Sequence, residues 1–266
     1  MPRAARRWPS RMLIGRDRLF YSGLVGDAMQ SRRLGAVAIY AAVDGDLEIK
    51  LGAAPWRRRR LVALPPYAPH LLRTPSGEIV NLCLESESID ADELSALIAG
   101  INEGEDERLI ARLVEARREL APVGVGFSTQ AFDDHFLRRA PKARALDPRI
   151  RRVLDALIDA AQEQTISAEF CAARIGVSAS RFLHLFKDDT GMSFRRARMW
   201  KRARRFLDHA HRDDSLTEVA LDLGYPDSSH FSHSIRACFG LQPRSIRRGS
   251  RGMKVCLGEN YALSGA

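Results

Sequence analysis

The feature that most constrains the fold is a repeat in the second half of the chain. Five residues, Ser180, Phe182, His184, Lys187 and Gly191, recur 49 positions later as Ser229, Phe231, His233, Arg236 and Gly240. A glycine and a hydrophobic residue precede each copy, as Gly176-Val177 and Gly224-Tyr225. This pattern indicates a tight turn followed by a helix, present twice, and is typical of two helix-turn-helix units side by side.

The helical period separates an inner and an outer face in each unit. Phe182 and Phe186 lie four residues apart and should face the core, so Ser180, His184 and Lys187 should face outward. Ser178 and Asp227 are good N-caps, so we expect recognition helices over about 178–189 and 227–238. Between them, Phe194–Ala210 reads as a connecting helix. Its buried stripe is Trp200, Ala203, Phe206 and Leu207, and its basic remainder is Arg195, Arg196, Lys201, Arg202, Arg204 and Arg205.

Positive charge is concentrated in the half that holds the repeat. The 266 residues carry a net charge of +9. Residues 1–140 hold 20 Lys and Arg against 19 Asp and Glu, whereas residues 141–266 hold 22 against 14. A basic half beside a neutral half is typical of a DNA-binding domain joined to another domain, so we expect double-stranded DNA as partner.

The outer faces supply the candidate DNA contacts, because helix N-terminal halves enter the major groove and basic side chains bind phosphates. The expected base contacts are Ser180, Leu183, His184, Ser228, Ser229, His230 and His233. The expected phosphate contacts are Arg181, Lys187, Arg195, Arg196 and Arg236. The alternative is that these are ordinary solvent-exposed helix residues, and Leu183 could equally be partly buried.

The first half reads as short strands and turns, followed by helices. Strand-like segments cover Val37–Tyr40, Asp46–Leu51, Arg60–Leu64 and Ile79–Leu84, and helical periods follow over Asp92–Ile101, Glu105–Leu120 and Thr129–Arg138. We therefore expect an α+β chain of two domains, with a small antiparallel β-barrel and helices (about 90–138) in residues 1–140. We further expect a linker over 141–149, an all-α domain over 150–248 and a loose tail over 249–266.

The helical half resembles the AraC/XylS family of transcription regulators. The resemblance lies in Gly176-Val177-Ser178, Leu185-Phe186-Lys187, Gly191, WKRARRFL at 200–207 and SLTEVALDLGYPDSSHFSHSIRACFGLQPRSIR at 215–247. It covers about residues 150–248 and implies a double, homeodomain-like helix-turn-helix domain that controls transcription at specific DNA sequences. The family usually has Arg at the position of His233, a difference that bears on base preference, and Phe at that of Ile235.

The first half resembles, less closely, the family's cupin-like sensor domain, which implies a small-molecule effector. Metal-binding cupins need a His-x-His pair, but the only histidines before residue 149 are His70 and His135. We therefore predict no metal and no cofactor. The chain shows no nucleophile-base constellation and no glycine-rich phosphate loop, so we predict no catalytic residues and no enzyme. A metal-dependent cupin enzyme, and a basic module that binds an acidic partner, are the competing hypotheses.

Several features have two interpretations. The run Arg57–Arg60 is either a second phosphate site or a solvated strand edge, and the apolar stripe of 105–120 covers either its own domain or also a partner subunit. Tyr40, Tyr67 and His70 either line a ligand cavity or pack in the core. The four cysteines are far apart and no apolar run reaches membrane length, so we expect a cytoplasmic protein with no membrane contact. RNA polymerase, an effector and a second copy of the chain stay open as partners.

Overall fold

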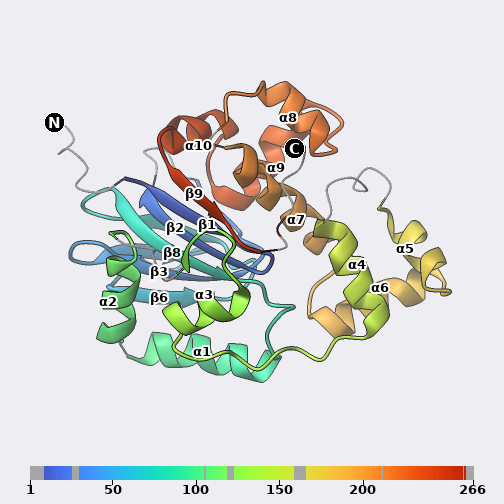
Figure 1. The fold of residues 1–266 in the computed structure, drawn as a ribbon, viewed down its shortest axis with the longest axis horizontal. Helices are drawn as coiled ribbons and strands as arrows, with labels where there is room; N and C mark the ends of the chain where they lie inside the picture. Colours follow the sequence, from blue (N-terminus) through green and yellow to red (C-terminus); the bar gives the residue numbers. More distant parts are fainter. Residues whose placement is uncertain are drawn as a thin grey trace.

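The computed structural model describes residues 9–25, 30–104, 106–118, 123–158, 166–210, 212–259 and 261. Figure 1 shows a β-sheet region with α1 below it, α8–α10 above it, and α4–α6 to one side. The strands are β1 (Arg11–Ile14), β2 (Arg18–Leu24), β3 (Val37–Ala42), β4 (Leu47–Leu51), β5 (Arg57–Arg59), β6 (Leu61–Leu64), β7 (His70–Arg73), β8 (Glu78–Leu84) and β9 (Lys254–Leu257).

The helices follow in two groups. The first group is α1 (Ala91–Glu103), α2 (Glu107–Glu115) and α3 (Thr129–Phe136). The second group is α4 (Pro148–Ile158), α5 (Ala168–Arg174), α6 (Ala179–Thr190), α7 (Phe194–His209), α8 (Leu216–Asp222), α9 (Ser228–Phe239) and α10 (Pro243–Ser250). Each helix predicted in the first half is present, with ends that differ by a few residues. No helix among the described residues is both long and apolar enough to cross a membrane.

The strands form two sheets. The larger has the order β6-β3-β8-β2-β1-β9, and the smaller has the order β5-β4-β7. An isolated backbone bridge, from Arg32 to His70, ties the segment before β3 to the start of β7. Across the described residues these sheets do not close, so the predicted barrel is replaced by an open two-sheet arrangement, and the cupin likeness is not confirmed.

The prediction of a loose tail over 249–266 is wrong for its first part. Residues Lys254–Leu257 form β9, which pairs in parallel with β1, Arg11 lying opposite Lys254 and Ile14 opposite Leu257. Gly258 continues this pairing through a bridge to Phe127. The tail carries little sequence periodicity because its conformation is set by a partner strand about 240 positions away. The last residues, 262–266, lie outside the described part.

Both faces of the large sheet are covered. One face packs on α1–α3 in a core that includes Phe20, Ile39, Leu82 and Phe132. The other face packs on α7–α9 in a core that includes Tyr40, Trp200, Phe206 and Phe231. Burial on both faces explains why all six residues of β3 are buried and why its sequence does not alternate between apolar and polar residues. The second helix-turn-helix unit therefore shares its core with the sheet.

The stripe predicted in 105–120 lies against its own domain. Leu109, Leu113 and Ala116 are buried in the core between the sheet and α1–α3, whereas Leu120 lies outside the described residues. Of the two interpretations that the sequence left open for this stripe, the structure therefore supports packing within the domain.

A buried ionic cluster joins the connecting helix to the sheet region. The Lys201 ammonium lies 3.2 Å from Glu85 and also pairs with Glu87, while Arg204 Nε lies 3.2 Å from Glu85. The Trp200 indole donates to both Glu85 carboxylate oxygens, at 3.0 and 2.9 Å. Lys201, Arg204 and Arg205 are all buried, so three of the six residues of the basic remainder of α7 are not on the surface. Lys201 and Arg204 contact the sheet domain.

Trp200 sits so close to the sheet domain that it requires a glycine. A Cβ atom added to Gly35 would lie 2.2 Å from the indole ring, a separation that no side chain could accept. The indole therefore packs directly on the backbone that precedes β3. Its size, its buried hydrogen bonds and this close approach fix the position of α7 on the sheet.

The first helix-turn-helix unit has its own core. The predicted linker is hydrogen-bonded to this unit. Phe182, Phe186, Phe194 and Ala197 pack with α4 and α5 in a third cluster. In the linker, Arg144 Nε donates to the Asp189 carbonyl at 2.7 Å. The all-α segment predicted over 150–248 thus contains two packing units, and only the first of them has a core separate from the sheet.

Replacing Lys201 should destabilise the whole chain. In Lys201→Met the two carboxylates of Glu85 and Glu87 keep their burial but lose their main counter-charge, and breaking a buried pair costs about 3–5 kcal/mol. Urea unfolding of the full chain would measure this loss. The exposed Lys187→Ala should stay within about 0.5 kcal/mol of the wild type. A Lys201→Met loss below about 1 kcal/mol would contradict a structural role for the cluster.

Candidate nucleic-acid interface

The first helix-turn-helix unit is built from α5, a turn and α6. Gly176 makes the turn with a φ of +71°, and the Ser178 hydroxyl caps α6 by accepting from the Arg181 backbone amide at 3.2 Å. Phe182 and Phe186 are fully buried and contact the Phe194 ring edge-on, which holds α6 against the start of α7. The opposite face of α6 is left to solvent.

The second unit repeats this construction. Gly224 makes the turn with a φ of +72°, and the Asp227 carboxylate caps α9 by accepting from the Ser229 and His230 amides, both at 2.8 Å. The capping box of Ser215 and Glu218 starts the supporting helix α8. Because α6 and α9 each contain 12 residues and end at left-handed glycines, Gly191 and Gly240, the spacing of 49 in the sequence corresponds to two equivalent helices.

Every residue predicted to contact bases is exposed. Ser180, Leu183 and His184 lie on the outer face of α6, where the Leu183 side chain is 43% exposed. Ser228, Ser229, His230 and His233 lie on exposed positions of α9. His230 is partly engaged, because its Nδ1 lies 2.8 Å from the Asp227 carboxylate that caps the helix. The other polar side chains of this set face solvent.

The predicted phosphate contacts are more varied in their surroundings. Arg181, Lys187 and Arg195 are exposed. Arg196 is exposed as well, but its guanidinium lies 5.3 Å from the centre of the Tyr67 ring, on the sheet side of the molecule. Arg236 is half-buried. Three of the five thus project freely beside the recognition helices, and Arg196 also contacts the first half of the chain.

The connecting helix α7 sets the relation between the two outer faces. Its first turns, with Phe194 and Ala197, belong to the core of the first unit, and its remainder, from Trp200 to Ala210, belongs to the core shared with the sheet. Its 16 residues span about 24 Å, which with packing at both ends suits two helices one DNA turn apart.

A cavity of about 430 Å³ lies between the sheet and the second unit. Its walls come from β1, β2 and β8 on one side and from α7, α9 and α10 on the other, and are mostly apolar, with Leu19, Trp200, Leu207 and Ile246 among them. Its size and composition are those of a small-molecule site. Apart from Tyr40, none of the residues that line this cavity was predicted from the sequence, because they come from segments far apart in the chain.

Two polar atoms on the cavity wall lack partners. Arg32 Nη2 and Asn81 Oδ1 are buried and make no hydrogen bond within the described part of the chain. The Arg32 guanidinium also lies 4.8 Å from the centre of the Tyr40 ring. A donor and an acceptor that are buried but unpaired can be satisfied by a ligand with a matching acceptor and donor.

Arg32 is positioned by a neutral histidine. Burial, reinforced by the Arg32 charge, lowers the pKa of His70 from 6.5 to about 3. Because Nδ1 lies 2.8 Å from the Ala68 carbonyl, it carries the proton, and Nε2 accepts from the Tyr40 hydroxyl at 2.9 Å and from Arg32 Nε at 3.2 Å. Tyr40 therefore lines the cavity, whereas His70 supports it from behind.

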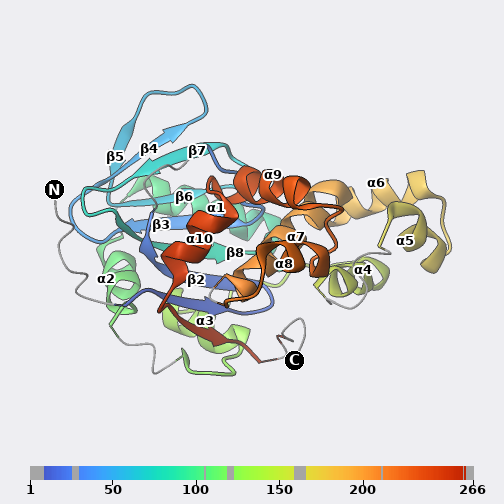
Figure 2. The ribbon, with the colours of Figure 1, turned by 90° about the horizontal axis from the view of Figure 1, so that it is seen from above.

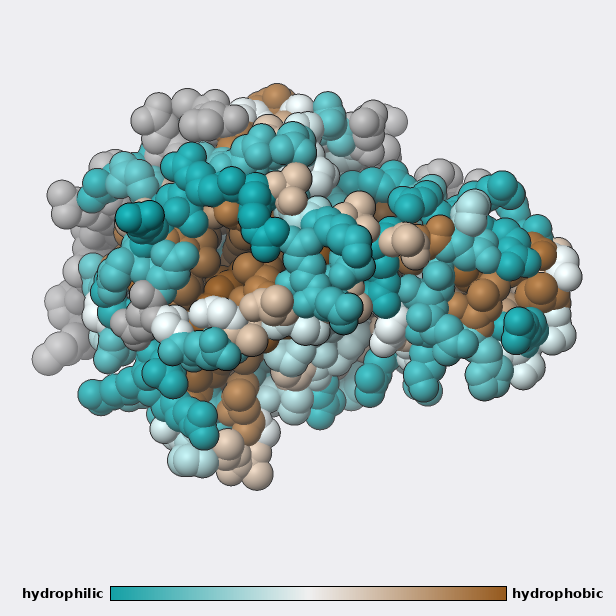
Figure 3. All heavy atoms as spheres, turned by 90° about the horizontal axis from the view of Figure 1, so that it is seen from below, coloured by the Kyte–Doolittle hydropathy of each residue, from teal (hydrophilic) through white to brown (hydrophobic). Residues whose placement is uncertain are grey.

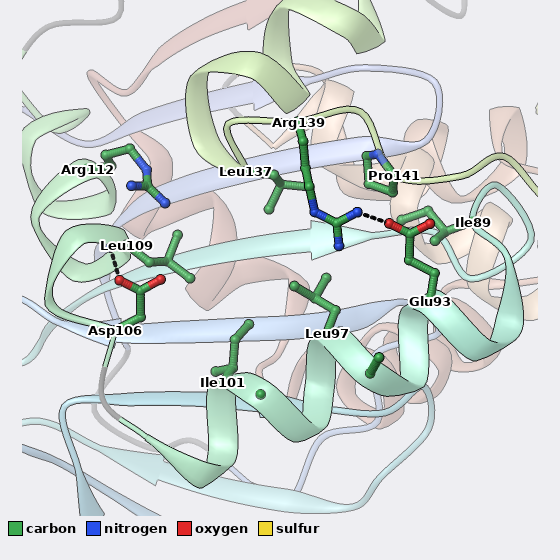
Figure 4. Close-up of a pocket in the computed structure, with 12 residues that line it drawn as sticks. Ile89, Glu93, Leu97, Ile101, Asp106, Leu109, Arg112, Leu137, Arg139 and Pro141 are labelled. Atoms are coloured by element: carbon green, nitrogen blue, oxygen red, sulfur yellow. Dashed lines mark hydrogen bonds and ion pairs between the residues drawn. The ribbon is translucent and has the colours of Figure 1, made fainter.

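A second, shallower hollow of about 310 Å³ lies on the face that carries α1. Figure 3 shows it as a hydrophobic depression ringed by hydrophilic side chains, and Figure 4 shows Leu97, Ile101, Leu109 and Leu137 around it. Its charged neighbours are already engaged, since Glu93 pairs with Arg139 and Asp106 caps α2. No group of three or more His, Cys, Asp or Glu residues in the described ranges could hold a metal ion.

Comparison with known proteins bears on the helical half. The helix-turn-helix domain family matches residues 171–249. The HTH-type transcriptional activator RhaS of Escherichia fergusonii is 38% identical over 90 residues, which cover 32% of this chain and 31% of RhaS. The bifunctional transcriptional activator/DNA repair enzyme Ada of Escherichia coli K12 is 28% identical over 123 residues, which cover 46% of this chain and 34% of Ada.

Residues 171–249 are a helix-turn-helix domain similar to the domains of these AraC/XylS-type transcriptional activators. The match spans only about a third of the length of these curated relatives. ToxT from Vibrio cholerae O395 has a similar fold over most of the chain, with a TM-score of 0.55, 10% identity, and coverage of 86% of this chain and 97% of ToxT. At that identity the likeness concerns the fold alone. The resemblance drawn from the helix-turn-helix motifs is thus confirmed.

The low pKa of His70 makes the fold of this protein sensitive to acid. An unfolded histidine titrates near 6.5 and the folded one near 3, so the unfolded state binds a proton first as the pH falls. The contribution of His70 is therefore complete above pH 6.5 and is lost below it, at about 1.4 kcal/mol per pH unit. His70→Gln keeps a donor and an acceptor but does not titrate. Urea unfolding at pH 7 and pH 4.5 should show a shallower pH dependence for this variant, and equal slopes would refute the assignment.

Proposed function

We propose that this protein is a sequence-specific DNA-binding regulator of transcription of the AraC type. Helices α6 and α9 enter two adjacent segments of the major groove. Ser180, Leu183 and His184 contact bases from α6, and Ser228, Ser229, His230 and His233 contact them from α9. Arg181, Lys187, Arg195, Arg196 and Arg236 hold the flanking phosphates. The relatives named above as transcriptional activators support regulation as the purpose of binding.

The observation that carries this proposal is the equivalence of α6 and α9. Both have 12 residues, a side-chain N-cap and a left-handed glycine at the C-cap, and both expose an equivalent serine and histidine, Ser180 and His184 on α6 and Ser229 and His233 on α9. They lie in the half of the chain that carries a charge of +8. A module that bound only an acidic protein would need the charge but not the paired, hydrogen-bonding faces. RNA polymerase and a second copy of the chain are further partners consistent with this role.

Selection of bound sequences from a random duplex pool tests the proposal directly. The full chain should enrich a motif with two short elements about 10 base pairs apart, because the two helices reach the same side of the duplex. Tight binding without any enriched motif would leave a non-specific basic module and overturn the proposal.

Substitutions on the outer faces should separate affinity from preference. Lys187→Ala should weaken binding to all sequences alike and flatten the salt dependence, because phosphate contacts carry no sequence information. His184→Ala and His233→Ala should instead change the preferred bases, by about 1–3 kcal/mol for a good contact. Asp213→Ala, exposed and off both recognition helices, serves as the control. Unchanged affinity and preference in both histidine variants would show that these positions do not contact bases.

A small-molecule effector fits the cavity between the sheet and the second unit. Because its walls belong to both halves of the chain, a bound molecule contacts the sensor sheet and the helices that support α9 at the same time. The apolar walls and the unpaired atoms of Arg32 and Asn81 favour a compact, mostly apolar molecule with a polar or anionic group at one end.

An anionic apolar dye tests this site. Anilinonaphthalene sulfonate should bind the native protein at one site, with fluorescence enhancement, and Arg32→Ala should weaken binding about 10–100-fold by removing a charged hydrogen bond. Arg112→Ala, in the hollow beside α1, is the matched control and should leave binding unchanged. Ile246→Trp should block the cavity from its other wall. Dye binding that is insensitive to both cavity variants would place the dye elsewhere.

A further inference from the structure

Positive charge in the first half of the chain gathers on the small sheet. Residues 47–73 hold six Lys and Arg and one acidic residue, whereas the rest of residues 1–140 holds 14 and 18. The nearly neutral charge of this half therefore conceals a sheet of charge +5 and a remainder of charge −4. Because the positive and negative charges are separated, the small sheet attracts an anionic surface.

The edge strand β5 presents most of this charge. Arg57, Arg58 and Arg59 are all exposed. Arg58 lies 3.3 Å from Glu48, and Arg60 pairs with Glu107. Arg57 and Arg59 alternate with Arg58 along the strand, and their backbones pair with Ile49 and Leu47 of β4. Within the described residues, no hydrogen bond or ion pair engages their side chains. These two guanidinium groups are available to an external anion.

The hairpin of β4 and β5 lies on the same side of the molecule as the recognition helices. In Figure 2 the hairpin, α9 and α6 follow one another along the upper edge of the molecule, while α8 and α4 lie below the two recognition helices. Backbone contacts fix this arrangement. The carbonyls of Gly240 and Ala237, at the end of α9, accept from the amides of Gln30 and Arg33, and Arg32 pairs with His70 at the start of β7.

We infer that the β4–β5 hairpin is a third DNA contact, in which Arg57 and Arg59 bind backbone phosphates of the duplex beyond the element read by α9. The inference rests on the proposed DNA-binding function. A duplex that follows α6 and α9 along this edge continues past the small sheet, where an exposed pair of arginines meets the next stretch of backbone. The contact adds affinity without sequence information, because phosphates are alike in every sequence. The competing explanation is a charged edge strand that only prevents sheet-to-sheet association.

Binding to duplexes of different length distinguishes these explanations. The full chain is titrated with a core duplex containing only the two selected elements, and with duplexes extended by about 10 base pairs on the α9 side or on the α6 side. The half of the selected DNA motif that changes in His184→Ala is the half that α6 reads, and the half that changes in His233→Ala is the half that α9 reads. Arg57→Gln/Arg59→Gln removes the two charges and keeps the strand polar. Arg108→Ala/Arg118→Ala removes two charges from α2 and the residues that follow it, and is the matched control.

The wild type should bind the α9-side extension more tightly than the core, with a salt slope steeper by about 1.8 for two phosphates. That advantage should fall about 12-fold between 50 and 200 mM salt. The Arg57→Gln/Arg59→Gln variant should lose it and keep the core affinity, and the α6-side extension should add nothing. Equal binding of all three duplexes, or an advantage that survives in the variant, overturns the inference while specific core binding upholds the proposed function. Absence of specific core binding overturns both.

Discussion

The burial of the large sheet on both faces is the constraint on which the rest of the structure depends. A sheet with one open face could support a separate DNA-binding domain on a flexible linker. Here the second face is covered by α7–α9. The interface includes Trp200, which packs on Gly35, and the ionic cluster around Glu85. Charged groups in such a place are tolerated only when they are paired, so Lys201 and Arg204 tie the orientation of α7 to two carboxylates of the sheet domain.

This arrangement divides the two helix-turn-helix units unequally. The second unit shares a core with the sheet, and its recognition helix α9 is held at its end by backbone hydrogen bonds from residues 30 and 33. The first unit keeps its own core and reaches the first half through smaller contacts, among them Arg144 with Asp189 and Arg196 with Tyr67. Tyr67 itself has a φ of +62°, an uncommon conformation for a bulky residue, and its amide donates to the Leu34 carbonyl. Movement between the units must therefore pass through α7.

The sequence predicted best what is determined locally. Helices α6 and α9 were found within one or two residues because their caps, turn glycines and apolar periods all lie within about 15 positions. The burial of Lys201 and Arg204 was not predicted, because a buried, paired cation and a solvated one look alike in a sequence, and their partners lie more than 100 positions away. Strand β9 was missed for the same reason, since a parallel edge strand needs only a partner with a free edge. The cavity was beyond prediction because its walls meet only after both halves have packed.

The position of that cavity determines how an effector could act. A ligand shifts an equilibrium only by its difference in affinity between two arrangements. A ligand bound wholly inside the sheet domain could affect the recognition helices only through a further conformational change. This cavity is walled by β-strands and by α7, α9 and α10, so it exists in this form only while the sheet and these helices are packed together. A molecule that fills it and satisfies Arg32 and Asn81 stabilises the docked arrangement, and with it the spacing of α6 and α9. A molecule too large for about 430 Å³ would instead separate the sheet from α7 and release that spacing. Under the proposed function, small and large ligands at this site would therefore have opposite effects on regulation.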